Sequence, residues 1–256
     1  MAVWVRFARG DGAEGFGVLA DESIAVHGGE MFGEVEATGE VLALAEVRLL
    51  APVRPEKFIG LWNNFHAVAT AQGYGVPEFP LFFLKAPSSI IATEGEIRAP
   101  RSYSGRIVYE GELGVVIGRR CHDVDEAAAE AAIFGYTCVN DVTAPDLFGD
   151  NSRFEQWGRA KGCDTFGPVG PGIATGLNWR ELRVRTRLNG RERQNYPVSD
   201  MIMPPPVIVS LLSREMTLEV GDLITCGTAA GILPMRSGAV VEVAIEGVGV
   251  LRNRVG

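Results

Sequence analysis

The sequence lacks three features that would place it outside or across a membrane. Its four cysteines stand far apart without C-x-x-C spacing, which excludes a disulfide framework and a typical zinc site. No apolar run approaches the roughly 18 residues that span a bilayer, and no basic amphipathic stretch indicates a membrane surface. The opening "MAVWVRFARG" has no basic region followed by an apolar one, as a signal peptide would. We therefore expect free thiols in a reducing cytoplasm and no membrane partner.

Positive charge is also scarce, and lysine most of all. The formal net charge is −8 and the pI is near 5.1, which argues against a nucleic-acid partner because phosphates require a basic footprint. Arginine supplies almost all the positive charge, and the only lysines are Lys57, Lys85 and Lys161. Where arginine is the default cation, a retained lysine can mark a place that needs a compact ammonium group.

What remains is enough for a large core: 46% of the 256 residues are hydrophobic, which suits one or two domains. Residues 1–50 form a candidate small β-rich domain, with short strand patterns broken by glycine at 3–8, 15–20 and 23–28. The stretch "GEVLALAEV" at 39–47 is compatible with a short helix. Two prolines in "LLAPVRP" at 49–55 predict a linker, and residues 56–256 a larger domain.

Strand patterns dominate the larger domain. We expect strands at 57–62, 81–86, 106–118, 134–141, 182–190, 222–227 and 239–255. Helices are fewer: one is predicted over 123–134, capped by Asp123 or Asp125 and ended by Gly135, and one over 204–216 behind a run of prolines. No regular β-α-β alternation occurs, so the predicted fold class is α+β, dominated by sheet.

The stretch "VYEGELGVVIG" at 108–118 carries two acids on a strand that is otherwise apolar. Residues two apart on a strand point to one face, about 6.5–7 Å apart, so Glu110 and Glu112 project together. Buried neighbouring carboxylates repel, and a hard divalent cation would relieve that repulsion. Asp141 ends the next predicted strand, which returns after a helical crossover and can supply a third ligand. The alternative is a solvated strand face with two surface glutamates.

Several motifs occur together in a recognisable order. "YEGELGVVIG", "GYTCVNDVT" and "QWGRAKGCDTFGPVGP", with "FFLKAPSS" upstream and "PVSDMI", "GDLITCGTAAG" and "GVGVLRNRV" downstream, resemble the fumarylacetoacetate hydrolase family over roughly residues 56–256. The resemblance implies a mixed β-sandwich roll, a homodimer, and Mg²⁺ or Mn²⁺ held by Glu110, Glu112 and Asp141. It also implies a small-molecule 2-oxo or enol acid as substrate. Such an acid can chelate a metal that stabilises the enolate formed by proton loss, decarboxylation or C–C cleavage.

The resemblance assigns further roles. Lys161, in the K-x-x-D-T-F segment, would approach the bound substrate and hold a developing oxyanion. Lys85 matches a family lysine that binds substrate, pairs with acids or supports a loop. Thr228, in "CGTAAG", would hold the substrate carboxylate, although Ala229 stands where proline is usual. Plain surface or turn positions are the alternatives for Lys161 and Thr228.

Two departures from the family pattern bear on the reaction. The family's H-x-x-E pair activates water; His66 is present as a candidate catalytic residue, but Ala69 replaces the glutamate, and Glu78 is a candidate substitute. After Asp141, Pro145 and Phe148 stand where arginine and glutamine are usual. Their presence predicts a more apolar or differently shaped pocket and argues against fumarylacetoacetate as substrate.

Ala69 favours an isomerase or decarboxylase over a hydrolase. The expected activity resembles that of 2-hydroxyhepta-2,4-diene-1,7-dioate isomerase in aromatic-compound degradation. The alternative enzyme is a C–C hydrolase of the acylpyruvate or fumarylpyruvate type. A third alternative is a binding protein that keeps the metal site and has lost turnover.

Overall fold

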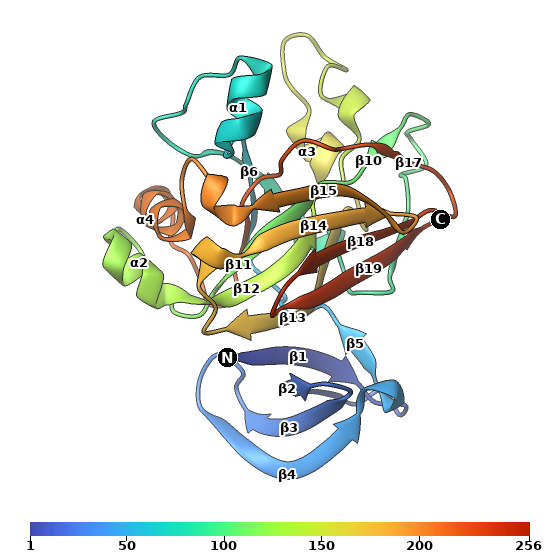
Figure 1. The fold of residues 1–256 in the computed structure, drawn as a ribbon, viewed down its shortest axis with the longest axis vertical. Helices are drawn as coiled ribbons and strands as arrows, with labels where there is room; N and C mark the ends of the chain where they lie inside the picture. The colour runs from blue at the N-terminus through green and yellow to red at the C-terminus, as the bar shows by residue number, and fades with distance from the viewer.

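The computed structural model describes residues 1–256 and consists mainly of β-sheet (Figure 1). The largest sheet has twelve strands in the order β4-β3-β2-β1-β13-β12-β11-β16-β6-β7, with β5 paired to β1 and β8 to β13. A second sheet has the order β15-β14-β18-β19-β9, and β10 pairs with β17. The expected sheet-dominated α+β fold is confirmed.

The strands have the following bounds: β1 (Ala2–Ala8), β2 (Glu14–Ala20), β3 (Ser23–Gly29), β4 (Val35–Ala43), β5 (Arg48–Leu50), β6 (Phe58–Trp62), β7 (Leu81–Lys85), β8 (Ile90–Ile91), β9 (Glu96–Ile97), β10 (Ile107–Val108), β11 (Gly111–Ile117), β12 (Ile133–Asn140), β13 (Gly167–Thr175), β14 (Arg183–Leu188), β15 (Arg191–Pro197), β16 (Leu223–Thr225), β17 (Pro234–Met235), β18 (Val240–Ile245) and β19 (Gly249–Val255). The α-helices are α1 (His66–Gln72), α2 (Glu126–Ala132), α3 (Trp157–Lys161) and α4 (Pro205–Glu215). No helix is long and apolar enough to cross a membrane.

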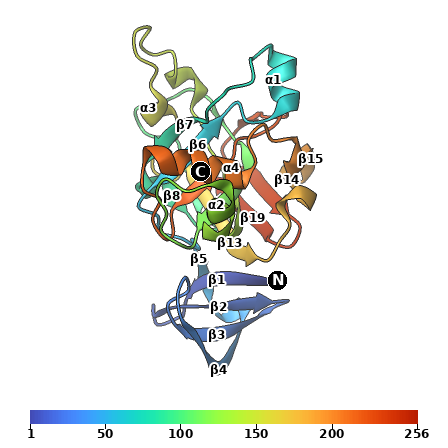
Figure 2. The same ribbon diagram turned by 90° about the vertical axis from the view of Figure 1, so that its left-hand side faces the viewer.

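The N-terminal strands form a small β domain with its own core. Alternation along β1 turns Val5 and Phe7 inward, where they meet Ile24 and Val26 of β3. The domain is not detached, because β1 pairs antiparallel with β13 of the larger part (Figures 1 and 2). The large sheet therefore runs through both parts of the chain.

The prediction of a short helix at 39–47 was wrong. Residues up to Ala43 belong to β4, and only Leu44–Glu46 form a single 3₁₀ turn. Pairing with β3 explains the difference, because the register Ala25↔Val41 to Ser23↔Ala43 gives this segment a hydrogen-bonded neighbour. Tertiary pairing here overrides local helical propensity. Strand β5 also extends into the predicted linker.

The main core lies between the two large sheets. Leu113 and Val115 of β11 pack with Val184 of β14 and Val243 of β18, and all are buried. Helices α2 and α4 add Ala129, Ile208 and other apolar side chains to the same core. These sheets and helices give β11 and β12 rigid, buried surroundings on both faces.

Helix α2 follows the predicted signals at its start but not at its end. The Asp125 side chain accepts a hydrogen bond from Ala128 N at 2.8 Å, as an N-cap does. The helix ends at Ala132, and Gly135 lies within β12 instead. A Cβ on Gly135 would lie 2.4 Å from the Ala174 carbonyl oxygen, so glycine permits close pairing with β13.

The predicted strand 106–118 is two strands, β10 and β11, separated at Tyr109 and Glu110. Strand β10 pairs with β17, whereas β11 lies between β12 and β16. At the break, Glu110 N donates to the Asn140 side chain at 3.1 Å rather than to a strand ladder. The chain thus changes sheets directly beside the two acids.

Candidate active site

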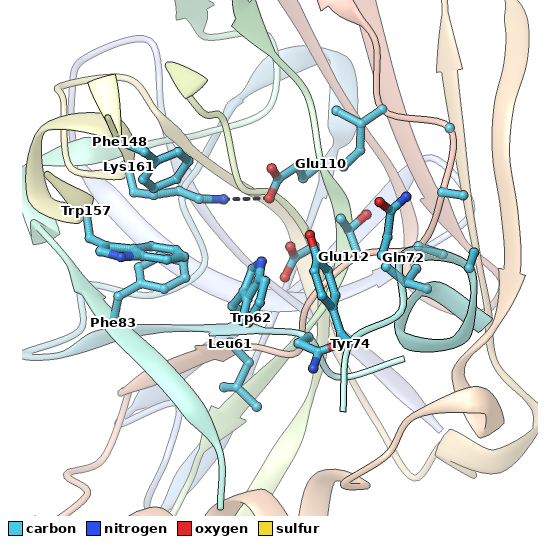
Figure 3. A pocket seen from close by; sticks show the side chains of 18 of the residues that line it. Leu61, Trp62, Gln72, Tyr74, Phe83, Glu110, Glu112, Phe148, Trp157 and Lys161 are labelled. Carbon is cyan, nitrogen blue, oxygen red and sulfur yellow. Dashed lines mark hydrogen bonds and ion pairs between the residues drawn. The ribbon is translucent and has the colours of Figure 1, made fainter. Parts of the chain in front are cut away.

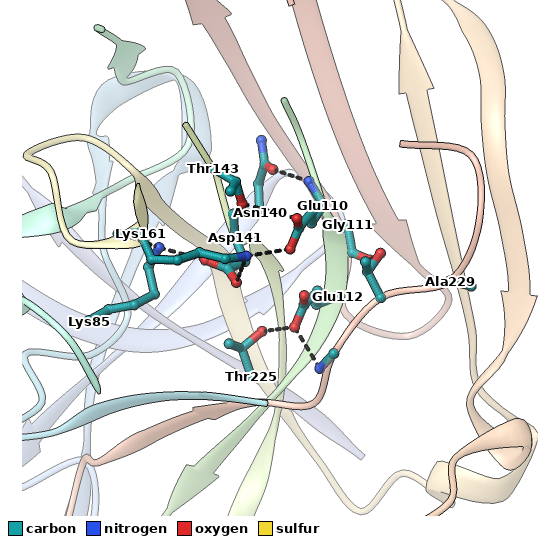
Figure 4. Close-up of polar contacts among 12 residues, drawn as sticks. Lys85, Glu110, Gly111, Glu112, Asn140, Asp141, Thr143, Lys161, Thr225 and Ala229 are labelled. Carbon is teal, nitrogen blue, oxygen red and sulfur yellow. Dashed lines mark hydrogen bonds and ion pairs between the residues drawn. The ribbon is translucent and has the colours of Figure 1, made fainter. Parts of the chain in front are cut away.

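The three predicted acids lie together at one end of the β11–β12 pair (Figure 4). Asp141 N donates to the Glu110 carbonyl oxygen at 2.8 Å, which fixes the end of β12 beside the start of β11. One carboxylate oxygen from each of Glu110, Glu112 and Asp141 lies within 4.8 Å of the others. Glu112 and Asp141 are fully buried, and Glu110 is partly buried, so the surface-glutamate alternative does not describe them.

Gly111 allows this convergence. A Cβ at Gly111 would lie 1.9 Å from Thr186 Oγ1 of β14, so the backbone between the two glutamates can approach the second sheet only without a side chain. Gly111 N donates to Gln194 Oε1 at 3.1 Å, and its carbonyl oxygen accepts from Tyr196 at 2.6 Å. The glutamates are therefore held by a backbone that the second sheet anchors.

Two of the three lysines lie in the same group (Figure 4). Lys161, on α3, donates to Glu110 Oε2 at 2.5 Å and to Asp141 Oδ2 at 2.6 Å. Lys85, on β7, donates to Asp141 Oδ1 and to the Lys161 carbonyl oxygen, both at 2.5 Å. Lys57 is elsewhere and pairs with Asp222 at 2.8 Å.

The lysines and acids of this group shift each other's pKa values. Burial lowers the pKa of Lys161, but Asp141, Glu110 and Glu112 raise it by more, so the net shift is upward and the amine stays protonated. Burial also raises the pKa of Asp141, but Lys161 and Lys85 outweigh it and keep this pKa low.

Glu112 has no ion-pair partner. Its Oε2 accepts from Thr225 Oγ1 at 2.5 Å and from Gly227 N at 2.7 Å. Burial, and then Asp141 and Glu110, raise the pKa of Glu112 well above its usual range. If all three carboxyl groups and both lysines are ionised, one buried negative charge has no partner, and a divalent cation would relieve it. Oxygen donors of this kind suit Mg²⁺ or Mn²⁺, so the residues fit a divalent metal.

The acidic group opens into a cavity of about 660 Å³ (Figure 3). Glu110, Glu112 and Lys161 line it, and so does Thr228, whose Oγ1 donates to the Gly111 carbonyl oxygen at 3.0 Å. The other lining residues come from β6, α1, β7, α3 and the loops beside them: Leu61, Trp62, Asn63, Val68, Ala71, Gln72, Tyr74, Phe83, Phe148, Glu155, Trp157, Ala229, Ala230, Gly231 and Ile232.

Not every predicted site residue reaches the cavity. Lys85 is buried behind Asp141 and does not line it. His66 is exposed at the first position of α1, and its helix turns Val68, Ala71 and Gln72 toward the cavity instead. Glu78 is exposed and outside the lining. Phe148 lines the cavity, whereas Pro145 does not.

Sequence reasoning named Phe148 but missed Glu155 and the other four aromatic residues of the cavity. Trp62, Tyr74, Phe83 and Trp157 come from four separate segments, and no spacing in the sequence links them. The proximity of Glu155 and Trp157 to "GRAKGCDTF" was the one available signal.

Comparison with known proteins agrees with this geometry. A family model described as fumarylacetoacetate (FAA) hydrolase C-terminal matches residues 57–256. The chain belongs to the fumarylacetoacetate hydrolase family. A second model, Rv2993c-like, N-terminal, matches residues 4–52. The chain is thus a fumarylacetoacetate-hydrolase-family enzyme with this type of N-terminal domain.

Two curated relatives illustrate the range of similarity. Protein Rv2993c of Mycobacterium tuberculosis is 42% identical over 255 residues, which are 98% of this chain and 94% of the relative. Oxaloacetate tautomerase YisK of Bacillus subtilis is 36% identical over 220 residues, 80% of this chain and 72% of the relative.

Solved structures of family members superpose closely. The 2-hydroxyhepta-2,4-diene-1,7-dioate isomerase of Mycobacterium marinum is 38% identical with a TM-score of 0.90, over 100% of this chain and 98% of that one. The 5-carboxymethyl-2-hydroxymuconate delta-isomerase of Mycobacterium smegmatis is 37% identical with a TM-score of 0.89, over 100% and 99%. Maleylpyruvate hydrolase from Sphingobium, in complex with manganese(II) and pyruvate, is 26% identical with a TM-score of 0.79, over 98% of each chain.

Proposed function

We propose that the protein is a Mg²⁺- or Mn²⁺-dependent enzyme that tautomerises, isomerises or decarboxylates a 2-oxo or enol carboxylate. The observation that carries this proposal is the buried group of three carboxylates and two lysines at the wall of a cavity large enough for a small molecule. The tautomerase and isomerase names of the relatives above support the same reaction type.

Glu110, Glu112 and Asp141 would hold the cation. When bound, such a cation supplies a Lewis acid that stabilises negative charge on a neighbouring substrate oxygen. The manganese and pyruvate of the similar maleylpyruvate hydrolase support a divalent ion and a 2-oxo acid here. Lys161, kept protonated by its acidic neighbours, would place a second positive charge beside that oxygen.

Lys85 has a different part in this proposal. Its ammonium group contacts Asp141 and the Lys161 backbone but does not line the cavity. We infer a positioning residue that fixes Asp141 and Lys161, in place of the direct substrate contact predicted from the sequence. Exchange of Lys85 would therefore act through the geometry of those two residues.

The loop after β16 would bind the substrate carboxylate. Thr228, Ala229 and Ala230 line the cavity, and their backbone N–H groups have no backbone acceptor within the chain. A carboxylate can accept hydrogen bonds from several such donors at once. Thr228 would hold this loop in place through its bond to Gly111.

The alternative function is C–C hydrolysis, which the similarity to maleylpyruvate hydrolase favours. Hydrolysis requires an activated water molecule, and His66 was the candidate for that role. Its exposed position, and the buried Ala69 one turn later, give it neither access to the cavity nor an acidic partner. Tautomerisation or decarboxylation is therefore the better supported reaction.

A substrate screen tests the proposal. The chelated protein is reloaded with Mg²⁺ or Mn²⁺ and offered 2-oxo and enol acids, with enol absorbance and product mass followed together. We expect metal-dependent loss of enol without a mass change, or loss of CO₂, whereas added water would indicate hydrolysis. Glu112→Gln should abolish turnover, and Glu78→Gln, exposed and outside the cavity, should not. A folded, metal-loaded protein that binds these acids without converting any of them would support the non-catalytic alternative.

We also propose a homodimer that works in a reducing cytoplasm. The four free cysteines support the compartment. Strand β7, at the end of the large sheet, exposes Leu81, Phe82 and Leu84, which is unusual for a strand edge that faces water and supports contact with a second copy. Light scattering should give a molar mass twice that of one chain, and Leu84→Lys should reduce it to the mass of one chain. A monomeric parent protein would contradict the dimer.

A further inference from the structure

The cavity has a single positive side chain. Of the nineteen lining residues, only Glu110, Glu112, Glu155 and Lys161 have an acidic carboxyl or a basic side chain, and none is arginine or histidine. Lys161 is already paired with Glu110 and Asp141. Beyond the acidic group, the cavity therefore offers no cation to a second carboxylate at the far end of a substrate.

An aromatic wall begins at Lys161 and leads away from the acidic group; it consists of Phe83, Trp157 and Phe148 (Figure 3). Lys161 Nζ lies 5.2 Å from the centroid of the Phe83 ring. Phe83 stacks on Trp157, with ring centroids 5.1 Å apart and ring planes at 28°. The ring centroids of Trp157 and Phe148 are 4.6 Å apart. These rings give any group that extends past Lys161 a continuous apolar surface.

Other parts of the cavity are also apolar. Trp62 packs on Tyr74 with centroids 4.9 Å apart, and Leu61, Val68 and Ile232 contribute aliphatic groups. A second hollow of about 660 Å³ shares Trp62, Phe83, Glu155 and Trp157 with the first and continues over Leu81, Phe82 and Phe154. The apolar lining thus extends beyond the cavity itself.

Glu155 is the acidic lining residue beside the aromatic wall. Its carboxylate accepts a hydrogen bond from Trp157 Nε1 at 2.7 Å, which holds the negative charge next to the ring. A second carboxylate here would lose part of its hydration against the rings, find no cation among the lining residues and lie beside the exposed Glu155, and each of these effects is unfavourable. A phenyl or alkyl group would instead leave water and pack against the rings.

We propose that the substrate is a 2-oxo or enol monocarboxylate with an aromatic or alkyl far end, and that Phe148 and Glu155 select against a second carboxylate. This inference rests on the proposed function for the reacting end of the substrate. It departs from the dicarboxylate and the tricarboxylate that the names of two similar isomerases contain, and it assigns selectivity to residues outside the acidic group.

Two probes that differ only at the far end test the selectivity. Phenylpyruvate and para-carboxyphenylpyruvate carry the same 2-oxo acid and the same ring, and their enol–keto conversion is followed by absorbance with Mn²⁺. We expect kcat/KM to be at least about tenfold higher for phenylpyruvate, the scale at which pocket contacts separate related substrates. Equal or better use of para-carboxyphenylpyruvate would overturn the inference.

Variants assign the selectivity to residues. Phe148→Arg should narrow or reverse the preference, because it adds a cation to the wall, whereas Phe148→Leu keeps the site apolar and should preserve it. Glu155→Gln should raise kcat/KM for para-carboxyphenylpyruvate alone. The exposed Glu36→Gln, on β4 of the N-terminal domain and outside the cavity, is the matched control. A preference that neither Phe148→Arg nor Glu155→Gln changes would remove these residues from the selection.

Binding separates this inference from the proposed function. Calorimetry with the Mn²⁺-loaded protein measures the dissociation constant of each probe whether or not it reacts. Preferential binding of phenylpyruvate without turnover would refute the proposed reaction and keep the selectivity. Turnover of both probes without preference would refute the selectivity and keep the reaction, and no binding of either probe would refute both.

Discussion

Replacement of Gly111 by alanine should destabilise the protein, because this glycine lies where the backbone between Glu110 and Glu112 meets the second sheet. The added Cβ would lie 1.9 Å from Thr186 Oγ1 and 3.2 Å from Gln194 Oε1. The first separation is far below van der Waals contact, and both partners are buried, so a strand or a side chain must move. Overpacking of this kind costs about 1–3 kcal/mol.

Urea unfolding of the parent protein, Gly111→Ala, Thr186→Ala and the double variant measures this loss of stability. Gly111→Ala should lower the unfolding midpoint without a change in slope. Thr186→Ala removes the clashing hydroxyl, which has no hydrogen-bond partner, so no hydrogen bond is lost with it. The double variant should recover most of the loss, with a coupling energy of roughly 1–2 kcal/mol, within the range of residues in contact. Affinity for Mn²⁺ should fall in Gly111→Ala and recover in the double variant.

Gly10→Ala is the control, because a Cβ at Gly10 would have no atom within 4 Å and its φ is not positive. Its free energy of unfolding should stay within about 0.5 kcal/mol of the parent value. The reasoning is refuted if Gly111→Ala matches the parent protein, or if Thr186→Ala does not restore its stability.

Three further predictions concern other charged or titrating groups. Asp222 is fully buried and accepts hydrogen bonds from the Lys57 backbone and ammonium group at 2.7 and 2.8 Å. Asp222→Ala should therefore cost about 1–3 kcal/mol in urea unfolding, because it leaves the backbone N–H groups of Lys57 and Glu219 without an acceptor. Burial, and then the hydrogen bond to Asp146, raise the pKa of Tyr103 to about 12. That pKa exceeds the unfolded value of about 10, so the stabilisation is complete below pH ~10 and is lost as pH rises through ~12. Tyr103→Phe should flatten this part of the stability–pH profile. Saturating Mg²⁺ or Mn²⁺ should raise the thermal midpoint. At a free metal concentration of one hundred times Kd, the free energy of unfolding should increase by about 2.7 kcal/mol, and Glu112→Gln should weaken this effect.

Each of these predictions has an outcome that contradicts it. A loss of less than about 1 kcal/mol in Asp222→Ala would mean that the ion pair contributes little. If Tyr103→Phe leaves the alkaline part of the stability–pH profile unchanged, groups other than Tyr103 cause the loss of stability there. A thermal midpoint that ignores both metals in the parent protein would argue against the metal site itself.

The convergence of the acids could be predicted because it depends on local rules. The two-residue spacing sets the relation of Glu110 to Glu112. Asp141 joins them for another reason than the predicted crossover: β12 runs antiparallel to β11, so the end of β12 lies beside the start of β11. A crossover between parallel strands would have placed Asp141 at the opposite end of β11. The break at Tyr109 could not be predicted in the same way. It arises because β10 pairs with β17, more than a hundred residues later, and no local pattern encodes that partner.

The cavity was the least predictable part of the site. Its aromatic lining comes from the ends of strands, a short helix and loops, and a single Trp62 or Phe83 has the sequence appearance of an ordinary core residue. Glu155 is an exposed acid, and nothing in the sequence separates it from the surface acids that lie away from the cavity. The direction of His66 depends on how α1 is seated, which the motif around it does not specify.

The pairing of β1 with β13 affects which parts of the protein can be expressed alone. Ala2, Val3 and Trp4 pair with Thr175, Ala174 and Ile173, so the first residues of the chain cover one side of β13, a strand that also pairs with β12. A fragment that starts after the linker would expose this side of β13, and uncovered strand edges recruit other chains. Expression of residues 57–256 alone should therefore yield self-associating material, because the N-terminal strands cover this edge of the larger domain that holds the acids.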